Sequence, residues 1–355
     1  MRPSRLKIAV LFGGRSAEHD VSVLSATNVM AALAPEKYEP MPIFVTREGQ
    51  WLLSRFEDGV LAMPENGTEV ALVPGGRGRL ILLGADGQVV GTDRIGMLFP
   101  VLHGLFGEDG SVQGMAEVAR VPLAGCGLLG SATALDKIMA KRLLNAAGIP
   151  VACWVAIGQH EAPDFAGLER ALGLPIFIKP ARQGSSVGVR KVSGSQEFQP
   201  ALDQALRFDH CILAEEFVEG REIEFSVLED ETGGLFVSRP GEIVPAERHG
   251  FYSYDAKYVD ETGAVLKVPA DLPQEVESAM RDMASRAFRA LGCDGMARVD
   301  FFLKEDGVFL VNELNTIPGF TDISLYAKAM AASGIAYPEI IDRLVSHGLA
   351  RANRP

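Results

Sequence analysis

A predicted β-hairpin over residues 298–315 constrains the fold of this chain more than any other stretch. Its sequence, RVDFFLKEDGVFLVNELN, consists of two apolar runs that meet at Asp306-Gly307. Aspartate and glycine both accept the positive φ of a type I′ turn, so this dipeptide is a strong hairpin signal. A two-residue turn here makes Glu305 oppose Val308 and thereby fixes the register of both arms.

That register places four polar side chains together on one face of the hairpin. Asp300 opposes Glu313. Arg298 opposes Asn315, and the next positions along the same face are Phe302 and Val311. Opposed Cβ atoms lie about 4.5–5.5 Å apart, so two carboxylates there need a cation, a shared proton or access to water. Two carboxylates and an amide oxygen suit Mg²⁺ beside substrate phosphates, whereas a solvated sheet edge is the alternative and a β-bulge would break the register.

The composition indicates a soluble protein of more than one domain. A chain of 355 residues exceeds what one hydrophobic core usually serves, so we expect two or three domains. The net charge of −12 argues against nucleic acid or an anionic membrane as the main partner. No stretch approaches the roughly 20 apolar residues of a membrane span, and the first apolar run is too short for a signal peptide. We expect a cytoplasmic protein whose four cysteines are buried free thiols, because they form no CxxC pair: Cys126, Cys153, Cys211 and Cys293.

The N-terminal part of the chain predicts a parallel, doubly wound α/β unit. A buried strand over 6–12 is followed by a glycine-containing loop, a helix capped by Asp20 or Ser22, and a second strand over 38–46. Residues 47–93 contain short strand-like pieces and predict β-hairpin decoration. Further elements are predicted in this order: a strand at 95–104, a helix at 131–148 with Ser131 as N-cap, strands at 174–180, 189–193, 211–218 and 222–229, and helices near 195–207 and 273–291.

Nucleotide binding is indicated by a glycine-serine loop rather than by a P-loop. The chain contains no G-x-x-x-x-G-K-[ST] and no G-x-G-x-x-G, so a P-loop NTPase is excluded and a dinucleotide enzyme has little support. Lys179 closes a strand, and the loop over 184–188 can direct several backbone N–H groups at a phosphate. A plain hairpin turn with a solvated lysine is the alternative, as is a surface lysine for Lys137.

Three other stretches offer candidate contacts. In AEEFVEGREIE (214–224), backbone near Phe217 and Val218 can pair with an adenine edge and Glu222 can accept from ribose hydroxyls, unless this is a half-buried strand with a wet face. Glu18 and His103 follow strands at the edge where open α/β sheets bind ligands. The loop around His249 resembles a lid, with Gly250 as hinge and several aromatic residues and a lysine: Phe251, Tyr252, Tyr254, Lys257 and Tyr258.

Eight motifs occur in the order found in D-alanine–D-alanine ligases of the ATP-grasp superfamily, and the chain resembles that family over nearly its whole length. They are FGGRSAEHDVS, PVLHGLFGEDG, DK at 136–137, FIKPARQGSSVGV, EEFVEGREIE, FYSYDAKY, ARVDFF and VNELNTIPGFTDIS. The resemblance implies an α/β (α+β) ATP-grasp fold of three domains. These are a Rossmann-like doubly wound domain over 1–127, followed by α+β subdomains over 128–218 and 219–355 that clasp ATP.

The resemblance also implies roles for individual residues. ATP would be held by Lys137, Lys179, Ser185, Ser186, Glu215, Phe217, Val218, Glu222 and Lys257. Two Mg²⁺ or Mn²⁺ ions would be held by Asp300, Glu313 and Asn315, with Glu313 bridging. Glu18 would pair with the ammonium of the first D-alanine, hydrogen-bonded with Ser185 and Tyr258 and with His103 nearby; Ser324 and the Leu325 N–H would take the carboxylate of the second. Arg298 and the Gly319 N–H would stabilise the tetrahedral oxyanion.

The implied reaction makes D-alanyl-D-alanine for peptidoglycan synthesis through a D-alanyl phosphate, releasing ADP and phosphate. A D-alanine–D-lactate (depsipeptide) ligase is the nearest alternative; Tyr258 favours the dipeptide enzyme, and His249 leaves the choice open. A non-catalytic nucleotide- or metal-binding regulator would not need Glu18 and Arg298 as well as the acidic set. The partners are then small-molecule substrates, and a homodimer is expected from the resemblance. Position 216 is glutamate where many members carry lysine, so its side chain is given no role.

Overall fold

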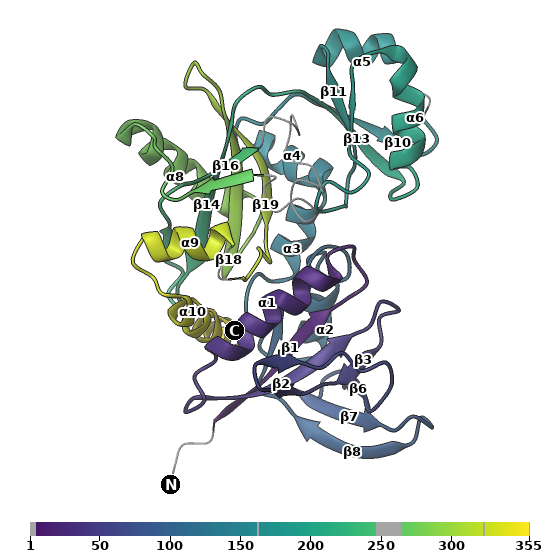
Figure 1. The fold of residues 1–355 in the computed structure, drawn as a ribbon, viewed down its shortest axis with the longest axis vertical. Helices are drawn as coiled ribbons and strands as arrows, with labels where there is room; N and C mark the ends of the chain where they lie inside the picture. Colours follow the sequence, from purple (N-terminus) through teal and green to yellow (C-terminus); the bar gives the residue numbers. More distant parts are fainter. Residues whose placement is uncertain (1–4, 162, 246–263, 322–323, 355) are drawn as a thin grey trace.

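The computed structural model describes residues 5–161, 163–245, 264–321 and 324–354, which form three main sheets (Figure 1). The first is seven-stranded, in the order β8-β7-β6-β3-β2-β1-β9. Its parallel part consists of β1 (Leu6–Gly13), β2 (Tyr38–Val45) and β9 (Met97–Pro100). The antiparallel part consists of β3 (Trp51–Leu53), β6 (Glu69–Leu72), β7 (Arg79–Leu83) and β8 (Val89–Arg94), and a small hairpin joins β4 (Phe56–Glu57) to β5 (Val60–Leu61). The predicted doubly wound unit is confirmed, and its decoration extends the same sheet.

Alternation along β1 decides which helices cover each face of this sheet. Ile8, Val10 and Phe12 pack in one core with α1 (His19–Ala32) and α10 (Tyr337–Ala352). Ala9 and Leu11 point the other way and pack in a second core with α2 (Ser111–Ala119). The C-terminal helix therefore covers the N-terminal sheet, which fixes the two ends of the chain against each other.

The predicted capping residues of α1 were wrong. The helix begins at His19 with Glu18 at the N-cap position, two to four residues before the expected Asp20 or Ser22. The Ser22 hydroxyl instead donates to the Val101 carbonyl and accepts from the Gly13 N–H at 2.8 Å. The buried Ser22 side chain therefore joins β1 to the segment after β9.

The second sheet is four-stranded and antiparallel, in the order β10-β13-β11-β12. Its strands are β10 (Trp154–Gly158), β11 (Ile176–Pro180), β12 (Arg190–Val192) and β13 (Cys211–Glu216), and its helices are α5 (Phe165–Leu172) and α6 (Ser195–Ala205). Both helices bury their apolar faces against this sheet in one core.

The single helix predicted over 131–148 is two helices, α3 (Leu128–Leu135) and α4 (Lys137–Ala146). Asp136 separates them, because its carboxylate accepts from the N–H groups of Ile138 at 3.1 Å and Met139 at 3.0 Å and so caps α4. Ser131, the predicted N-cap, is buried inside α3. The break places Lys137 at the first position of α4.

The third sheet is six-stranded and carries the predicted hairpin. Its order is β17-β16-β14-β18-β19, with β15 also paired to β14. The strands are β14 (Arg221–Glu229), β15 (Leu235–Val237), β16 (Gly241–Pro245), β17 (Ala264–Lys267), β18 (Met296–Leu303) and β19 (Phe309–Asn315). The amphipathic helix α8 (Gln274–Ala290) buries its apolar side against this sheet, and α9 (Leu325–Ala332) packs near β14.

Two departures from the predicted hairpin register cancel each other. The Lys304 N–H donates to the Val308 carbonyl at 2.8 Å, so the loop has three residues rather than two, with Gly307 at φ +83°. A register shift between Asp300 and Phe301 leaves Asn312 as an extra residue, which is a β-bulge. Beyond the bulge, Asp300 opposes Glu313 and Arg298 opposes Asn315, as predicted, whereas Phe302 opposes Leu310 rather than Val311.

The burial of the four cysteines and the length of the helices bear on two further predictions. Cys126 and Cys293 are buried free thiols, but Cys153 is exposed and Cys211 is partly exposed, so the expectation was wrong for that pair. Within the described ranges, we find no helix with the length and apolarity needed to cross a membrane.

Candidate active site

The acidic row, defined here as Glu224, Asp300 and Glu313, crosses three neighbouring strands of the third sheet. Pairing of β14 with β18 sets Glu224 opposite Asp300, and pairing of β18 with β19 sets Asp300 opposite Glu313. The next row toward the same end places Arg298 opposite Asn315. Glu224 was missed by sequence reasoning, because only the pairing of β14 with the hairpin brings it beside the other two. A pocket here is lined by Glu222, Ile223, Glu224, Arg298, Asp300, Phe301, Phe302, Asn312 and Glu313.

Arg298 holds the acidic row together. Its guanidinium makes a bidentate pair with Asp300, both contacts at 2.7 Å, and its Nε lies 3.0 Å from a Glu224 oxygen. Burial acts to lower the pKa of Arg298, but the neighbouring carboxylates outweigh it and raise that pKa well above its usual value. The Asn315 amide donates to Asp300 at 2.9 Å, which leaves its oxygen as an acceptor. The carboxylate and amide oxygens here are the hard donors that divalent cations such as Mg²⁺ prefer, so this donor set fits such a metal.

Lys137 connects the acidic row to the glycine-serine loop. From the start of α4, its ammonium lies 3.5 Å from a Glu313 oxygen and donates to the Gln183 carbonyl at 2.7 Å. The loop that follows has Ser185 at φ +51° and Ser186 at φ +58°, a left-handed conformation that is strained for residues with a Cβ. The Ser185 hydroxyl donates to Glu18 at 2.5 Å, so the loop is tied to the first residue before α1.

The lysine cluster, defined here as Lys141, Lys179 and Glu215, is linked to the acidic row through α4, which carries both Lys137 and Lys141. The Glu215 carboxylate forms ion pairs with both lysines, and its side chain is 2% exposed. Burial acts to raise the pKa of Glu215, but the two ammonium groups lower it overall, so the carboxylate stays charged. Lys141 was missed by sequence reasoning, although it lies one helical turn after Lys137 and therefore on a related face of α4. Glu215 was predicted to contact ATP, and its carboxylate lies between two cations.

The predicted adenine contacts lie around β13 and the edge of the hairpin. Lys191 lies 4.3 Å above the Phe217 ring. Val218 is buried in a small core with Ala152, Leu310 and Phe302. Glu222 opposes Phe302 across β14 and β18 and lines the same pocket as the acidic row. The Glu216 side chain accepts from the Cys153 N–H at 2.7 Å, which gives it a structural contact.

The predicted second-substrate contacts begin at α9. Ser324 is the N-cap of that helix and accepts from the Ala327 N–H at 3.5 Å, and Leu325 is its first residue. Gly319 precedes them, and a Cβ built on it would lie 3.7 Å from the Ser324 Cβ. Tyr258, Lys257 and His249 lie outside the described residues.

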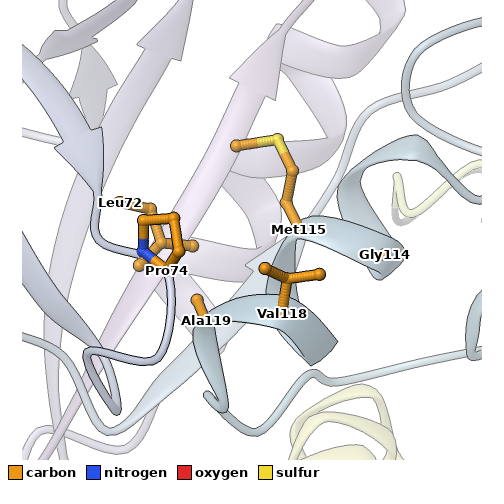
Figure 2. Close-up of a pocket in the computed structure, with 6 residues that line it drawn as sticks. All are labelled: Leu72, Pro74, Gly114, Met115, Val118 and Ala119. Atoms are coloured by element: carbon orange, nitrogen blue, oxygen red, sulfur yellow. The ribbon is translucent and has the colours of Figure 1, made fainter.

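A second pocket lies away from this site, between α2 and the end of β6 (Figure 2). Its lining is apolar and offers no titratable side chain among the residues that form it: Leu72, Pro74, Gly114, Met115, Val118 and Ala119. It contributes nothing to the chemistry of the acidic row.

Two family models match the chain in succession. "D-ala D-ala ligase N-terminus" matches residues 7–126, and "D-ala D-ala ligase C-terminus" matches residues 143–346. The chain belongs to the D-alanine–D-alanine ligase family. Family membership brings with it the ATP-grasp fold, an ATP-dependent ligation and the general use of a divalent metal.

Similar proteins match this chain over nearly its whole length. A D-alanine–D-alanine ligase A of Brucella suis is 63% identical over 353 residues, covering 99% of this chain and 100% of that protein. One from Mesorhizobium japonicum is 57% identical, covering 98% of each. Among solved structures, the D-alanine–D-alanine ligase from Coxiella burnetii matches with TM-score 0.83 and 31% identity over 98% of this chain and 95% of that one. The VanG D-Ala:D-Ser ligase from Enterococcus faecalis matches with TM-score 0.84 and 33% identity over 97% of this chain and 100% of that one.

Proposed function

We propose that this chain joins two D-alanines into D-alanyl-D-alanine, through a D-alanyl phosphate, with release of ADP and phosphate. The dipeptide serves peptidoglycan precursor synthesis. The observation that carries the proposal is the acidic row together with Arg298, which contacts Glu224 and Asp300, and Lys137, which lies near Glu313. Phosphoryl transfer depends mainly on positioning and charge neutralisation, and these groups can supply both. Relatives at 57–63% identity are named for the dipeptide reaction, so the D-lactate alternative is not favoured.

In this proposal the nucleotide lies between the lysine cluster and the acidic row. Lys137 and Lys179 contact the phosphates, and backbone N–H groups of Ser185 and Ser186 close over them; Lys257 adds a further contact. Phe217, Val218 and Glu222 hold adenine and ribose, whereas Glu215 acts by fixing Lys179. Asp300, Glu313 and Asn315 would hold two Mg²⁺ or Mn²⁺ ions, which would offset charge on the triphosphate.

The first half-reaction is then a displacement at the γ-phosphorus. Glu18 holds the ammonium of the first D-alanine, helped by Ser185, Tyr258 and His103, so that its carboxylate oxygen lies in line with the phosphorus. The new bond joins that oxygen to the phosphoryl group, and ADP leaves. In this geometry Arg298 neutralises charge that would otherwise repel the incoming carboxylate.

The second half-reaction is acyl transfer to an amine. Ser324 and the Leu325 N–H hold the carboxylate of the second D-alanine, and its neutral amine attacks the acyl phosphate carbonyl. Arg298 and the Gly319 N–H stabilise the oxyanion, and collapse of the tetrahedral intermediate forms the amide and expels phosphate, which takes up the proton that the amine loses. We assign the exclusion of water to the loop around His249, which lies outside the described residues, since hydrolysis of the acyl phosphate competes with this step.

The domain boundaries, the cellular location and the oligomeric state belong to the same proposal. We assign the domains as 1–127, 128–218 and 219–355, place the enzyme in the cytoplasm, and expect a homodimer. Light scattering of the purified chain tests the last of these, and a monomer at micromolar concentration would contradict it.

Phosphate release from ATP tests the function directly. We expect turnover with D-alanine alone and formation of the dipeptide by mass spectrometry. Parallel reactions contain D-lactate or D-serine together with D-alanine; D-serine is included because a structural relative is a D-Ala:D-Ser ligase. Absence of D-alanine-stimulated turnover would contradict the proposal, and a depsipeptide peak larger than the dipeptide peak at neutral pH would favour the lactate enzyme.

A further inference from the structure

The loop over 316–320, sequence TIPGF, carries the Gly319 N–H that the proposed function assigns to the oxyanion. Residues from the N-terminal part of the chain hold the start of this loop. The Ile317 N–H donates to Glu108 at 2.8 Å, and the Ile317 carbonyl accepts from His103 Nδ1 at 2.9 Å. These contacts join positions 209 and 214 residues apart in sequence. Both the N–H and the carbonyl of Ile317 are therefore held by residues from the N-terminal part of the chain.

The end of the same loop is held in a similar way. The Phe320 N–H donates to the Ser25 hydroxyl at 3.3 Å, and the Phe320 carbonyl accepts from the Tyr337 hydroxyl at 2.8 Å. Ser25 lies on α1, and Tyr337 is the first residue of α10. The contacts at Ile317 and Phe320 thus flank Gly319 on both sides.

The directions of these hydrogen bonds are mutually consistent. A carbonyl only accepts, so His103 Nδ1 must carry the hydrogen that is donated to Ile317. In a neutral imidazole Nε2 is then an acceptor, and it lies 3.2 Å from the Ser25 hydroxyl, which can donate to it. The Ser25 oxygen in turn accepts from Phe320. Burial lowers the pKa of His103, which agrees with the neutral ring that this network requires.

Glu108 closes the network. Its two carboxyl oxygens accept from the Gly104 N–H and the Ile317 N–H, both at 2.8 Å; the residue is 8% exposed, and burial raises its pKa to about 8. It therefore joins the turn after His103 to the loop that carries Gly319. A glutamine here would keep the shape but replace one acceptor by an NH₂ group that faces an N–H donor.

We propose that Ser25, His103 and Glu108 are positioning residues that fix the Gly319 N–H for the second half-reaction. This rests on the proposed function, which gives Gly319 its role. It also changes the expectation for His103, since both its ring nitrogens contact protein groups that act on the loop. A peptide N–H stabilises an oxyanion only when aimed at the position where charge develops, so displacement of the loop weakens the transition state more than substrate binding.

The test compares Ser25→Ala with Ser22→Ala. Both serines are buried on α1 and lie one turn apart, but the Ser22 hydroxyl contacts Gly13 and Val101 instead of the 316–320 loop. We expect Ser25→Ala to lower kcat by about 10- to 100-fold with KM for ATP within about twofold. Ser22→Ala should lower the melting temperature to a similar degree while keeping kcat near that of the unaltered protein.

A tetrahedral phosphinate analogue of the dipeptide separates positioning from a general structural role. Its P–O⁻ group occupies the oxyanion position, so Ser25→Ala and Glu108→Gln should weaken its inhibition by the same factor as they lower kcat/KM. His103→Asn keeps a donor for Ile317 and should retain more activity than His103→Ala; it also serves if the alanine variant does not fold. Unchanged inhibition in a slow variant, or equal loss of kcat in Ser22→Ala and Ser25→Ala, would overturn the inference. Failure of the proposed function itself would be seen earlier, as an unaltered protein that forms no dipeptide.

Discussion

The acidic row and the lysine cluster are two groups of charged side chains with opposite arrangements. In the row, Arg298 contacts the carboxylates of Glu224 and Asp300, and Lys137 lies 3.5 Å from Glu313. In the cluster, the Glu215 carboxylate forms ion pairs with the ammonium groups of Lys141 and Lys179. Carboxylate oxygens are ligands for divalent cations, and ammonium groups attract phosphate. The row is suited to cations and the cluster to phosphate. The two groups are therefore suited to the two parts of a metal–nucleotide complex, as the proposed function requires.

Glu313→Gln should have the largest effect on turnover. It keeps the shape of the side chain but removes a charge from the acidic row, so we expect phosphate release to fall by at least about 10²-fold. The melting temperature should change little, because the lost attraction to Lys137 is offset by weaker repulsion between neighbouring carboxylates. Equal losses of activity and stability would mean that Glu313 is structural, and the contrast between the two clusters would fail.

Glu215→Gln should affect stability more than turnover. It leaves Lys141 and Lys179 close together without their shared carboxylate, which should lower the free energy of unfolding by about 3–5 kcal/mol. Chemical denaturation monitored by circular dichroism measures this loss. A stability equal to that of the unaltered protein would show that the lysine cluster is not held by Glu215.

The same pair of proteins should differ in acid. The folded-state pKa of Glu215 is lowered from its ordinary 4.5, so its contribution to stability is present above that value and is lost as pH falls through the lower folded-state pKa. The unfolding free energies of the unaltered protein and of Glu215→Gln should therefore converge below about pH 4. Parallel curves down to pH 3 would contradict the assignment.

Lys141→Met sharpens the comparison, because it removes one ammonium group from the cluster without unpairing Glu215. Lys179 then forms a neutral pair with Glu215, and its attraction for phosphate decreases. We expect KM for ATP to rise about 3- to 10-fold, as for the loss of about 1 kcal/mol of electrostatic attraction. KM for D-alanine should change little. A larger effect on D-alanine than on ATP would place the cluster elsewhere in the reaction.

Gly307→Ala should have the smallest effect and serves as a control for the hairpin. Gly307 has φ +83° with nothing within 4 Å of a Cβ built on it, so the cost is conformational, about 1 kcal/mol. The loop lies at the opposite end of the hairpin from the acidic row, and kcat should be unchanged. Loss of activity in this variant would mean that the row depends on the hairpin loop.

Much of the fold and the core of the site could be predicted from sequence, because these depend on local pattern. Short apolar runs gave most of the strands, and period-two alternation along the hairpin gave the pairing of Asp300 with Glu313, although two departures in register had to cancel for it to hold. The ordered motifs gave the family. The break at Asp136 was missed, because one carboxylate that caps a helix looks like any other polar residue inside a helical pattern.

Only the tertiary structure decided which distant groups meet. Glu224 joins the acidic row because β14 pairs with β18, and Lys141 joins Glu215 because α4 packs beside β13. Ser25, His103 and Glu108 reach the loop that carries Gly319 across more than 200 residues of sequence. Periodicity and capping report contacts within a few residues of each other. Contacts between elements depend instead on how whole faces of helices and sheets pack. In this chain that packing brings together the side chains of the candidate site, which the local sequence identifies only one by one.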